Sequence, residues 1–238
     1  MKKIFISFSL LFFFLVSSAQ QTEFYAGVNT GFLSFRGKSA EKSSFITQSD
    51  VTSIPNTTND IYGRKAGAGI GIDLSLQRVT RSEIIFGIAA GVEILKSKIN
   101  IDAIWGRSGI SVAEGSVRLT SKFINIRPAA GYRFQVNKKL AIDVTGNLDL
   151  AFCISPHHEK GSATISGSGG NTVTTDIDRD KTGLDFRTGL QTRINYRRYS
   201  LLAGYWVGQT NYYKDYIGGN AEAYSRLFRA GISYRLTK

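Results

Sequence analysis

Large aliphatic residues alternate with glycine or polar residues along most of the chain, as in the run IGIDLSLQ at 70–77. A period of two is typical of a β-strand whose two faces meet different surroundings, and no stretch after residue 19 has a convincing helical period. The pattern predicts an all-β protein. Eight segments alternate well enough to be strands, and they are 23–36, 63–77, 83–97, 118–134, 139–154, 182–197, 199–210 and 224–236.

The connections between these segments alternate in length. Short turns are expected near 78–82, 135–138 and 198, whereas the connections at 37–62, 98–117, 155–181 and 211–223 are long. Bacterial outer-membrane barrels have an even number of strands, from eight upward, with short periplasmic turns and longer extracellular loops. We therefore predict an eight-stranded antiparallel up-and-down transmembrane β-barrel with this arrangement, located in the cell outer membrane.

The two faces of each predicted strand indicate which side meets lipid. One face carries residues such as Ile70, Ile72 and Leu74, and the other carries Gly71 and Asp73. In a soluble carrier such as a lipocalin, the second face would meet water and would be rich in lysine and glutamate. Glycine, alanine and compact polar groups instead suit the narrow inside of an eight-stranded barrel. We expect the apolar face to point outward.

The first residues have the layout of a secretory signal peptide. Lys2 and Lys3 precede an apolar stretch at 4–16, and small residues follow up to Ala19. This stretch is short for a membrane-spanning helix, which needs roughly 20 residues. We predict a signal peptide at 1–19 and one β-barrel domain at 20–238.

The formal net charge of the chain is +12, which could favour nucleic acid, anionic lipid or lipopolysaccharide phosphate. An export signal argues against nucleic acid. The expected partners are outer-membrane lipid and lipopolysaccharide, together with a possible protein partner at the extracellular loops. Basic residues expected to meet lipopolysaccharide phosphates include Lys38, Lys42, Lys96, Lys98 and Arg107.

Charged residues also fall on the predicted inward face. Because an unpaired buried charge costs several kcal/mol, each must be paired inside a closed barrel. We interpret the set as a salt-bridge network that fills the lumen; a gated ion path is the alternative. Its members are Asp73, Glu93, Arg127, Arg133, Asp143, Asp149, Asp185, Arg187, Arg193, Arg229 and Arg235.

An enzymatic interpretation rests on Ser155, His157, His158 and Glu159, which follow the fifth predicted strand. A serine, a histidine and an acid are the parts of an acyl-transfer site. Neighbours in one short segment rarely form that geometry, and adjacent residues of an extended chain point opposite ways, which also weakens a metal site here. The glycine run at 167–170 lacks the lysine of a phosphate-binding loop and is expected to be the bend of a hairpin. We expect no catalytic residues, no metal and no cofactor.

Three stretches resemble the PorT-like family of small outer-membrane barrels from Bacteroidota. They are INIRPAAGYRF at 124–134, NKKLAID at 137–143 and the closing strand RAGISYRL at 229–236. The resemblance covers nearly the whole chain after the signal peptide and implies an eight-stranded barrel inserted by the outer-membrane assembly machinery. Its motifs specify a fold and not an activity.

These observations favour a non-enzymatic integral outer-membrane barrel with a structural or partner-docking role through its extracellular loops. Two alternatives remain open at the level of sequence. One is a narrow channel or transporter, and the other is a lipid-modifying enzyme that uses Ser155 with His157 or His158.

Overall fold

The computed structural model describes residues 19–51, 53–167, 170–214 and 219–237. The predicted signal peptide lies outside these residues except at Ala19. Within the described part of the chain, no helix has the length and apolar character needed to cross a membrane.

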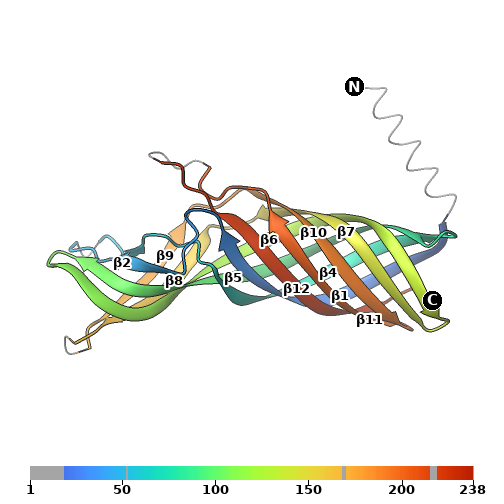
Figure 1. Ribbon diagram of the computed structural model, residues 1–238, viewed down its shortest axis with the longest axis horizontal. Coiled ribbons are helices and arrows are strands. Elements are labelled where there is room, and N and C mark those ends of the chain that lie inside the picture. The colour runs from blue at the N-terminus through green and yellow to red at the C-terminus, as the bar shows by residue number, and fades with distance from the viewer. Residues whose placement is uncertain (1–18, 52, 168–169, 215–218, 238) are drawn as a thin grey trace, which may run out of the picture.

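Twelve strands make up the described residues (Figure 1). In chain order they are β1 (Ala19–Arg36), β2 (Ser43–Thr47), β3 (Thr57–Thr58), β4 (Lys65–Thr80), β5 (Ile84–Gly106), β6 (Gly109–Asn137), β7 (Leu140–Cys153), β8 (His157–Ile165), β9 (Thr172–Arg179), β10 (Leu184–Tyr196), β11 (Tyr199–Gly208) and β12 (Tyr224–Arg235).

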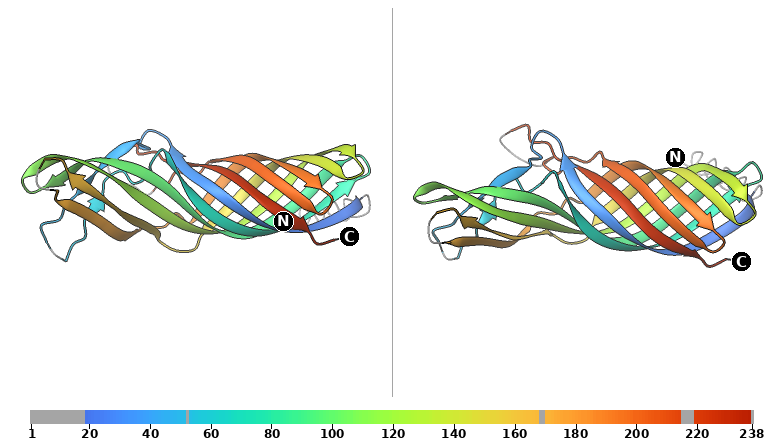
Figure 2. Two further views of the ribbon diagram at one scale, coloured as in Figure 1. Left: turned by 90° about the horizontal axis from the view of Figure 1, so that it is seen from below. Right: turned by 60° about the horizontal axis from the view of Figure 1, so that its bottom comes forward.

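Eight of these strands close into a ring. Its order is β1, β4, β5, β6, β7, β10, β11 and β12, and β12 pairs again with β1. Every neighbouring pair in the ring is antiparallel. The two views in Figure 2 show the tilted strands wrapping around a common axis. The ring strands coincide with the eight segments predicted from the alternating pattern.

The two ends of the ring differ. Tight connections at 81–83, 138–139 and 197–198 lie at one end, which we call the turn end, together with the start of β1 and the end of β12 (Figure 1). The opposite end, the loop end, carries the longer connections. The predicted loop at 98–117 is wrong, because β5 and β6 continue through it and are joined only by residues 107–108.

The added length of β5 and β6 is the base of a folded unit beyond the ring, which we call the cap. It consists of β2, β3, β8 and β9 together with the parts of β5 and β6 between Leu95 and Phe123, which lead to and from the bend at 107–108. Strand β2 pairs with β5 and β3 with β2, while β8 pairs with β6 and β9 with β8. The long connections at 37–62 and 155–181, expected as loops, therefore contain strands. The hairpin expected around 167–170 is formed by β8 and β9.

Outward residues of the ring form an apolar band. On β5 this band runs from Ile84 to Ile94, which is about 33 Å along a strand and about 25 Å along the barrel axis at a tilt of roughly 40°. That height matches the lipid-facing band of outer-membrane barrels. Lys96, the next outward residue on β5, ends the band.

Where the outward face changes from apolar to charged, the inward face changes from polar to apolar. Inside the apolar band it carries mainly small and polar residues, whereas beyond the band it carries large apolar side chains that form the core. Leu95, Ile99 and Ile101 of β5 belong to this core, and all are buried. Water surrounds the cap, so its strands bury their apolar face inward, as in an ordinary soluble β-protein.

The indole of Trp206 limits the space inside the ring. A Cβ at Gly189 on β10 would lie 2.5 Å from the Trp206 ring, and one at Gly204 would meet the same ring. Trp206 itself is fully buried. Glycine at both positions therefore makes room for the largest side chain of the core.

We expect Gly189→Val to abolish folding of the barrel, because the added side chain overlaps Trp206 and the carbonyl oxygen of Tyr205. The measurement is the fraction of folded, SDS-resistant protein that shifts on boiling. The matched control is Gly146→Val on β7, where a Cβ points outward and approaches only the Ala130 carbonyl oxygen at 3.8 Å. Equal folded fractions for the two variants would contradict this account of the core.

Candidate functional site

Charged residues fill the lumen of the ring. Among the described residues, six carboxylates and six arginines lie there, so the formal charge of the set is zero. Ten of the eleven residues expected on the inward face are buried, and Arg235 is half-buried near the turn end. The twelfth member, Glu23 on β1, is fully buried and was not anticipated.

One group of these charges lies near the turn end. Arg133 of β6 pairs with Glu23 at 2.7 Å and with Asp143 of β7 at 2.7 Å. Arg235 reaches the other Glu23 oxygen at 2.7 Å. The Gln77 amide donates to both Glu23 and Asp143, at 2.7 and 3.0 Å. These guanidinium and amide donors come from three strands, β4, β6 and β12.

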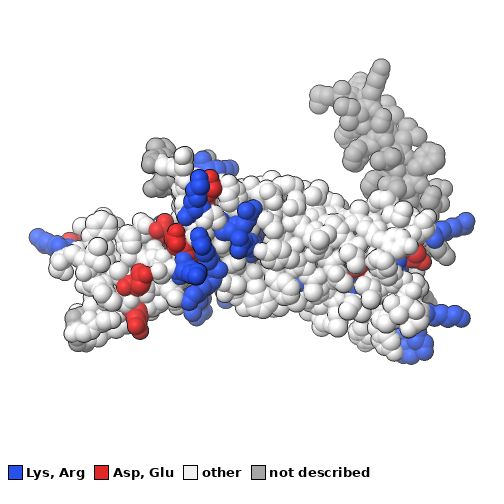
Figure 3. Space-filling model, in the orientation of Figure 1, with Lys and Arg blue, Asp and Glu red and all other residues white. Residues whose placement is uncertain are grey.

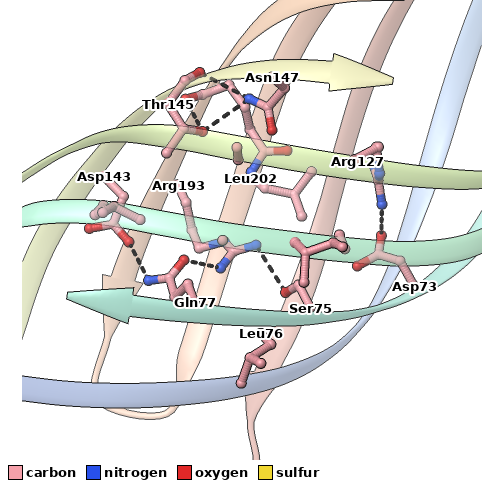
Figure 4. A pocket seen from close by; sticks show the side chains of 16 residues that line it. Asp73, Ser75, Leu76, Gln77, Arg127, Asp143, Thr145, Asn147, Arg193 and Leu202 are labelled. Atoms are coloured by element: carbon pink, nitrogen blue, oxygen red, sulfur yellow. Dashed lines mark hydrogen bonds and ion pairs between the residues drawn. The ribbon is translucent and has the colours of Figure 1, made fainter. Parts of the chain in front are cut away.

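A second group lies in the middle of the lumen, where Figure 4 shows side chains from several strands pointing toward one another. Arg127 pairs with Asp73 at 3.0 Å. Arg193 donates to Gln77 at 2.9 Å and lies over the Tyr25 ring at 4.5 Å from its centroid. The cavity between these groups has a volume of about 30 Å³, which is room for one or two water molecules.

The third group lies toward the loop end and is the most deeply buried. Arg229 contacts Glu93 at 2.8 Å and Asp149 at 2.7 Å. Arg187 contacts Glu93 at 3.0 Å and Asp185 at 2.7 Å. The two guanidinium groups stack on the rings of Trp206 and Phe123, at 4.6 and 4.8 Å. The apolar core begins directly at this layer of charge.

Tyr212 ties the connection between β11 and β12 to the same group. Its hydroxyl donates to Asp185 at 2.7 Å, and its ring packs edge-on against Phe35 and Tyr62. Tyr212 is therefore held by a polar contact on the lumen side and by aromatic contacts on the cap side. Through Tyr212, the described part of this connection is anchored to the lumen network.

Two signals in the sequence could have identified Glu23. It lies on the same alternating face as Tyr25 and Gly27, and the predicted set held five acids against six arginines. A closed lumen favours charge balance, because an unpaired buried ion is strongly unfavourable. The missing acid was thus implied by the count.

The four residues considered for catalysis point in different directions. His157 and Glu159 face inward and are fully buried, whereas His158 faces outward and contacts Asp176 and Asp178 at 3.3 and 3.0 Å. Glu159 binds Arg179 at 2.6 Å and the Thr58 hydroxyl of β3 at 2.6 Å. It thereby joins β3 to β8 and β9 and closes the cap. Ser155 donates to the neighbouring Pro156 carbonyl oxygen.

His157 does contact a serine, Ser121 of β6, at 2.8 Å from Nδ1. The backbone N–H of Thr182 donates to Nε2, so the neutral ring carries its proton on Nδ1 and donates it to the Ser121 hydroxyl. A general base would have to accept that proton instead. Both side chains are fully buried, and burial lowers the pKa of His157 to about 4. The pair is arranged as a structural contact in the cap core.

The fold and the lumen define an integral outer-membrane β-barrel. The chain belongs to the outer membrane protein beta-barrel domain family, which matches residues 6–235. No curated protein shows significant sequence similarity to the chain.

Among solved structures, the chain is similar to Neisserial surface protein A, with 12% identity over 90% of this chain and 99% of the other and a TM-score of 0.39. It is also similar to Ail, the attachment invasion locus protein of Yersinia pestis, with 10% identity over 90% and 97% and a TM-score of 0.31. The outer membrane protease OmpT from Escherichia coli shows 10% identity over 90% and 97% and a TM-score of 0.37. At these values the likeness carries no argument about activity.

We expect Glu93→Ala to destabilise the barrel by about 3–5 kcal/mol, because it leaves Arg187 and Arg229 buried with fewer partners. Urea unfolding in lipid vesicles measures the change. The control is Asp176→Ala, which removes an exposed partner of Lys160 and should leave the stability nearly unchanged, because exposed ion pairs contribute little. Similar losses for both variants would show that the lumen network does not stabilise the ring.

The buried histidine predicts a pH dependence. Between pH 6.5 and about 4 the unfolded His157 binds a proton that the folded site excludes, so stability falls as the pH is lowered through this window. The full loss attributable to His157 is roughly 3 kcal/mol. Urea midpoints at pH 7 and 4.5 should therefore differ less for His157→Asn than for the natural chain. Thr164→Ala, the control, changes an exposed residue of β8 that does not titrate and should retain the natural dependence. Identical behaviour of the natural chain and His157→Asn would refute the assignment.

Proposed function

We propose that this protein is a non-enzymatic outer-membrane barrel that holds the cap outside the cell for docking a protein partner. The supporting observation is an apolar patch at the end of the cap. Trp105, Ile110 and Val112 are 53%, 75% and 70% exposed, and the ring of Phe45 lies 5.8 Å from that of Trp105. We call these four residues the tip patch.

Contact with lipid explains the exposed apolar residues of the ring but not those of the tip patch. Exposed aliphatic residues on the ring contact lipid, but the β5–β6 hairpin projects well beyond the ring (Figure 1). Its bend at 107–108 lies more than ten residues past Ile94 on β5, or about 30 Å further along the barrel axis at the same tilt. Large apolar side chains in that position meet water unless a partner covers them.

The composition of the tip patch fits a protein partner. Trp105 and Ile110 are cross-strand neighbours, and Phe45 lies beside them on β2. Tryptophan is among the residues that contribute most to protein interfaces, where it is packed in a desolvated centre. The cap beneath the patch is rigidly connected through β5 and β6, which are continuous strands of the ring, so the patch is presented in a defined orientation.

The lumen argues against the channel alternative. Its cavity of about 30 Å³ lies between paired charges, and Leu33, Phe123 and Trp206 fill the ring on the loop side of these charges. The enzyme alternative is weakened by the burial and the donor direction of the Ser121–His157 contact. Both arguments favour a solid body that displays a surface.

The resemblance to the PorT-like barrels of Bacteroidota supports the same proposal, since it implies a barrel inserted by the assembly machinery with no assigned activity. In this arrangement the turn end faces the periplasm and the cap faces outward, as is usual for bacterial barrels. A role as an accessory in a membrane assembly and a role in envelope integrity are both compatible with a docking surface of this kind.

Site-specific photocrosslinking in intact cells tests the proposal. With the photoreactive residue at position 112, we expect a discrete cross-linked protein band, and none with it at position 164, an exposed site on β8. Adding Trp105→Ser and Ile110→Ser should weaken the band at 112 by about thirtyfold, since loss of an interface hot spot costs about 2 kcal/mol or more. The heat-shifted folded band serves as the control for folding.

Two results would count against this function. One is a cross-linked band at 112 that persists undiminished in the double variant, which would show that Trp105 and Ile110 do not bind the partner. The other is activity of the purified protein, measured as conductance above background in planar bilayers or as altered lipid A by mass spectrometry after overexpression. Either activity would replace docking with the corresponding alternative.

A further inference from the structure

A row of cations crosses four neighbouring strands just beyond the apolar band. Lys65 of β4 is directly opposite Lys98 of β5, which is opposite Arg118 of β6, which is opposite Lys160 of β8. On β5, Lys96 lies two residues nearer the membrane than Lys98. On β6, Lys122 lies four residues nearer the membrane than Arg118. Neighbouring strands are about 4.8 Å apart, so the first three cations of the row lie within about 10 Å.

A bulge in β4 brings Lys65 into this row. The register between β4 and β5 shifts between Gly67 and Ile70, so that Ile70 is opposite Ile94 but Lys65 is opposite Lys98. Without the extra residue, Lys65 would fall on the inward face with Gly71 and Asp73. The bulge therefore places a third positive charge outward, beside two others.

Carboxylates balance only one end of the row. Asp176 of β9 contacts Lys160 at 2.6 Å, and Asp176 and Asp178 both contact His158. Among the described residues, no carboxylate oxygen lies within 4.0 Å of Lys65, Lys96, Lys98, Arg118 or Lys122. Like charges directly opposite one another on a sheet are unfavourable. An anion from outside the chain would remove this repulsion.

The level of the row indicates what kind of anion fits. The last outward apolar residues below it are Ile70, Ile94 and Ile124, all exposed on the lipid-facing wall. The membrane-facing side of a ligand that binds the cations therefore adjoins the hydrocarbon layer. Above the row, Asn100 and Ser116 are opposite one another and face outward, so they offer neutral hydrogen-bonding groups suited to sugar hydroxyls.

On the visible face of the molecule, Figure 3 shows Lys and Arg side chains gathered between the uncharged wall of the ring and the cap, with Asp and Glu side chains beside them on the cap side. The amphiphile that matches acyl chains below, phosphate at the level of the cations and sugar above is a phosphorylated glycolipid of the outer leaflet. We propose that Lys65, Lys98 and Arg118, with Lys96 and Lys122 beneath them, form a binding site for the phosphate groups of lipid A.

This proposal goes beyond the docking function, since the tip patch is not part of the site. The test is native mass spectrometry of the full chain in detergent, with bisphosphorylated lipid A, the same lipid A after removal of its phosphates, and phosphatidylglycerol as probes. The test variant is Lys65→Ala/Lys98→Ala/Arg118→Ala. The matched control removes three exposed cations at the turn end, as Arg81→Ala/Lys138→Ala/Lys139→Ala.

We expect the natural chain to bind bisphosphorylated lipid A roughly ten- to a hundredfold more tightly than the dephosphorylated form, because three surface ion pairs each contribute up to about fivefold. The preference should weaken with added salt. The test variant should lose the preference, and the turn-end control should keep it. Phosphatidylglycerol should bind less tightly than bisphosphorylated lipid A, since it lacks the second phosphate and the sugars.

Stability without lipid separates binding from a structural role of the same side chains. If the row is a site for an external anion, the test variant in lipid-free detergent should unfold at the same or a higher urea concentration than the natural chain, since like-charge repulsion is removed. Equal binding of the two lipid A forms by the natural chain, equal binding of phosphatidylglycerol, or loss of preference in the turn-end control would each overturn the proposal. Trp105→Ser/Ile110→Ser should leave lipid A binding unchanged, so failure of either proposal is distinguishable from failure of the other.

Discussion

Charge neutrality inside the ring is the constraint on which the rest of this barrel depends. Six carboxylates and six arginines from opposite walls of the lumen meet within it, and all but Arg235 are buried. An eight-stranded ring has too little space to hydrate them separately, so each ion is held by its partners. Removing one partner leaves the other charge buried without compensation for its lost hydration, which is strongly destabilising. The network therefore links the strands across the barrel, in addition to the ladders that link them around it.

The second constraint is the change of surroundings at the membrane boundary. Along β5, the outward face changes from aliphatic to charged between Ile94 and Lys96, and the inward face changes from Glu93 to the aliphatic Leu95. Within the membrane, β5 thus presents aliphatic residues to lipid and polar residues to the lumen. Beyond the membrane boundary, the same strand presents polar residues to water and aliphatic residues to the core. This inversion converts the barrel into a base for the cap. It also seals the lumen, because the apolar core lies directly on the layer of Arg187 and Arg229.

Both proposals concern surface groups that contacts within the ring and the cap do not satisfy. These groups are the tip patch and the row through Lys65, Lys98 and Arg118. The first is apolar where there is water, and the second is positive where lipid headgroups begin. A protein partner and a phosphorylated glycolipid satisfy these two surfaces respectively. A body closed by paired charges and by Trp206 is suited to hold them in fixed positions.

The sequence by itself determined the ring strands, the outward and inward faces and nearly all of the lumen charges, because these follow from a local period of two. It also contained the extension of β5, since Ile99 and Ile101 continue the period with the two faces exchanged. Only the tertiary structure decided which ions pair, because Arg229 and Glu93 are 136 positions apart. The same holds for the cationic row, since a bulge in β4 and the registers of three strand pairs bring Lys65, Lys98 and Arg118 together. Strand register is a long-range property, and it is set by packing across the whole barrel.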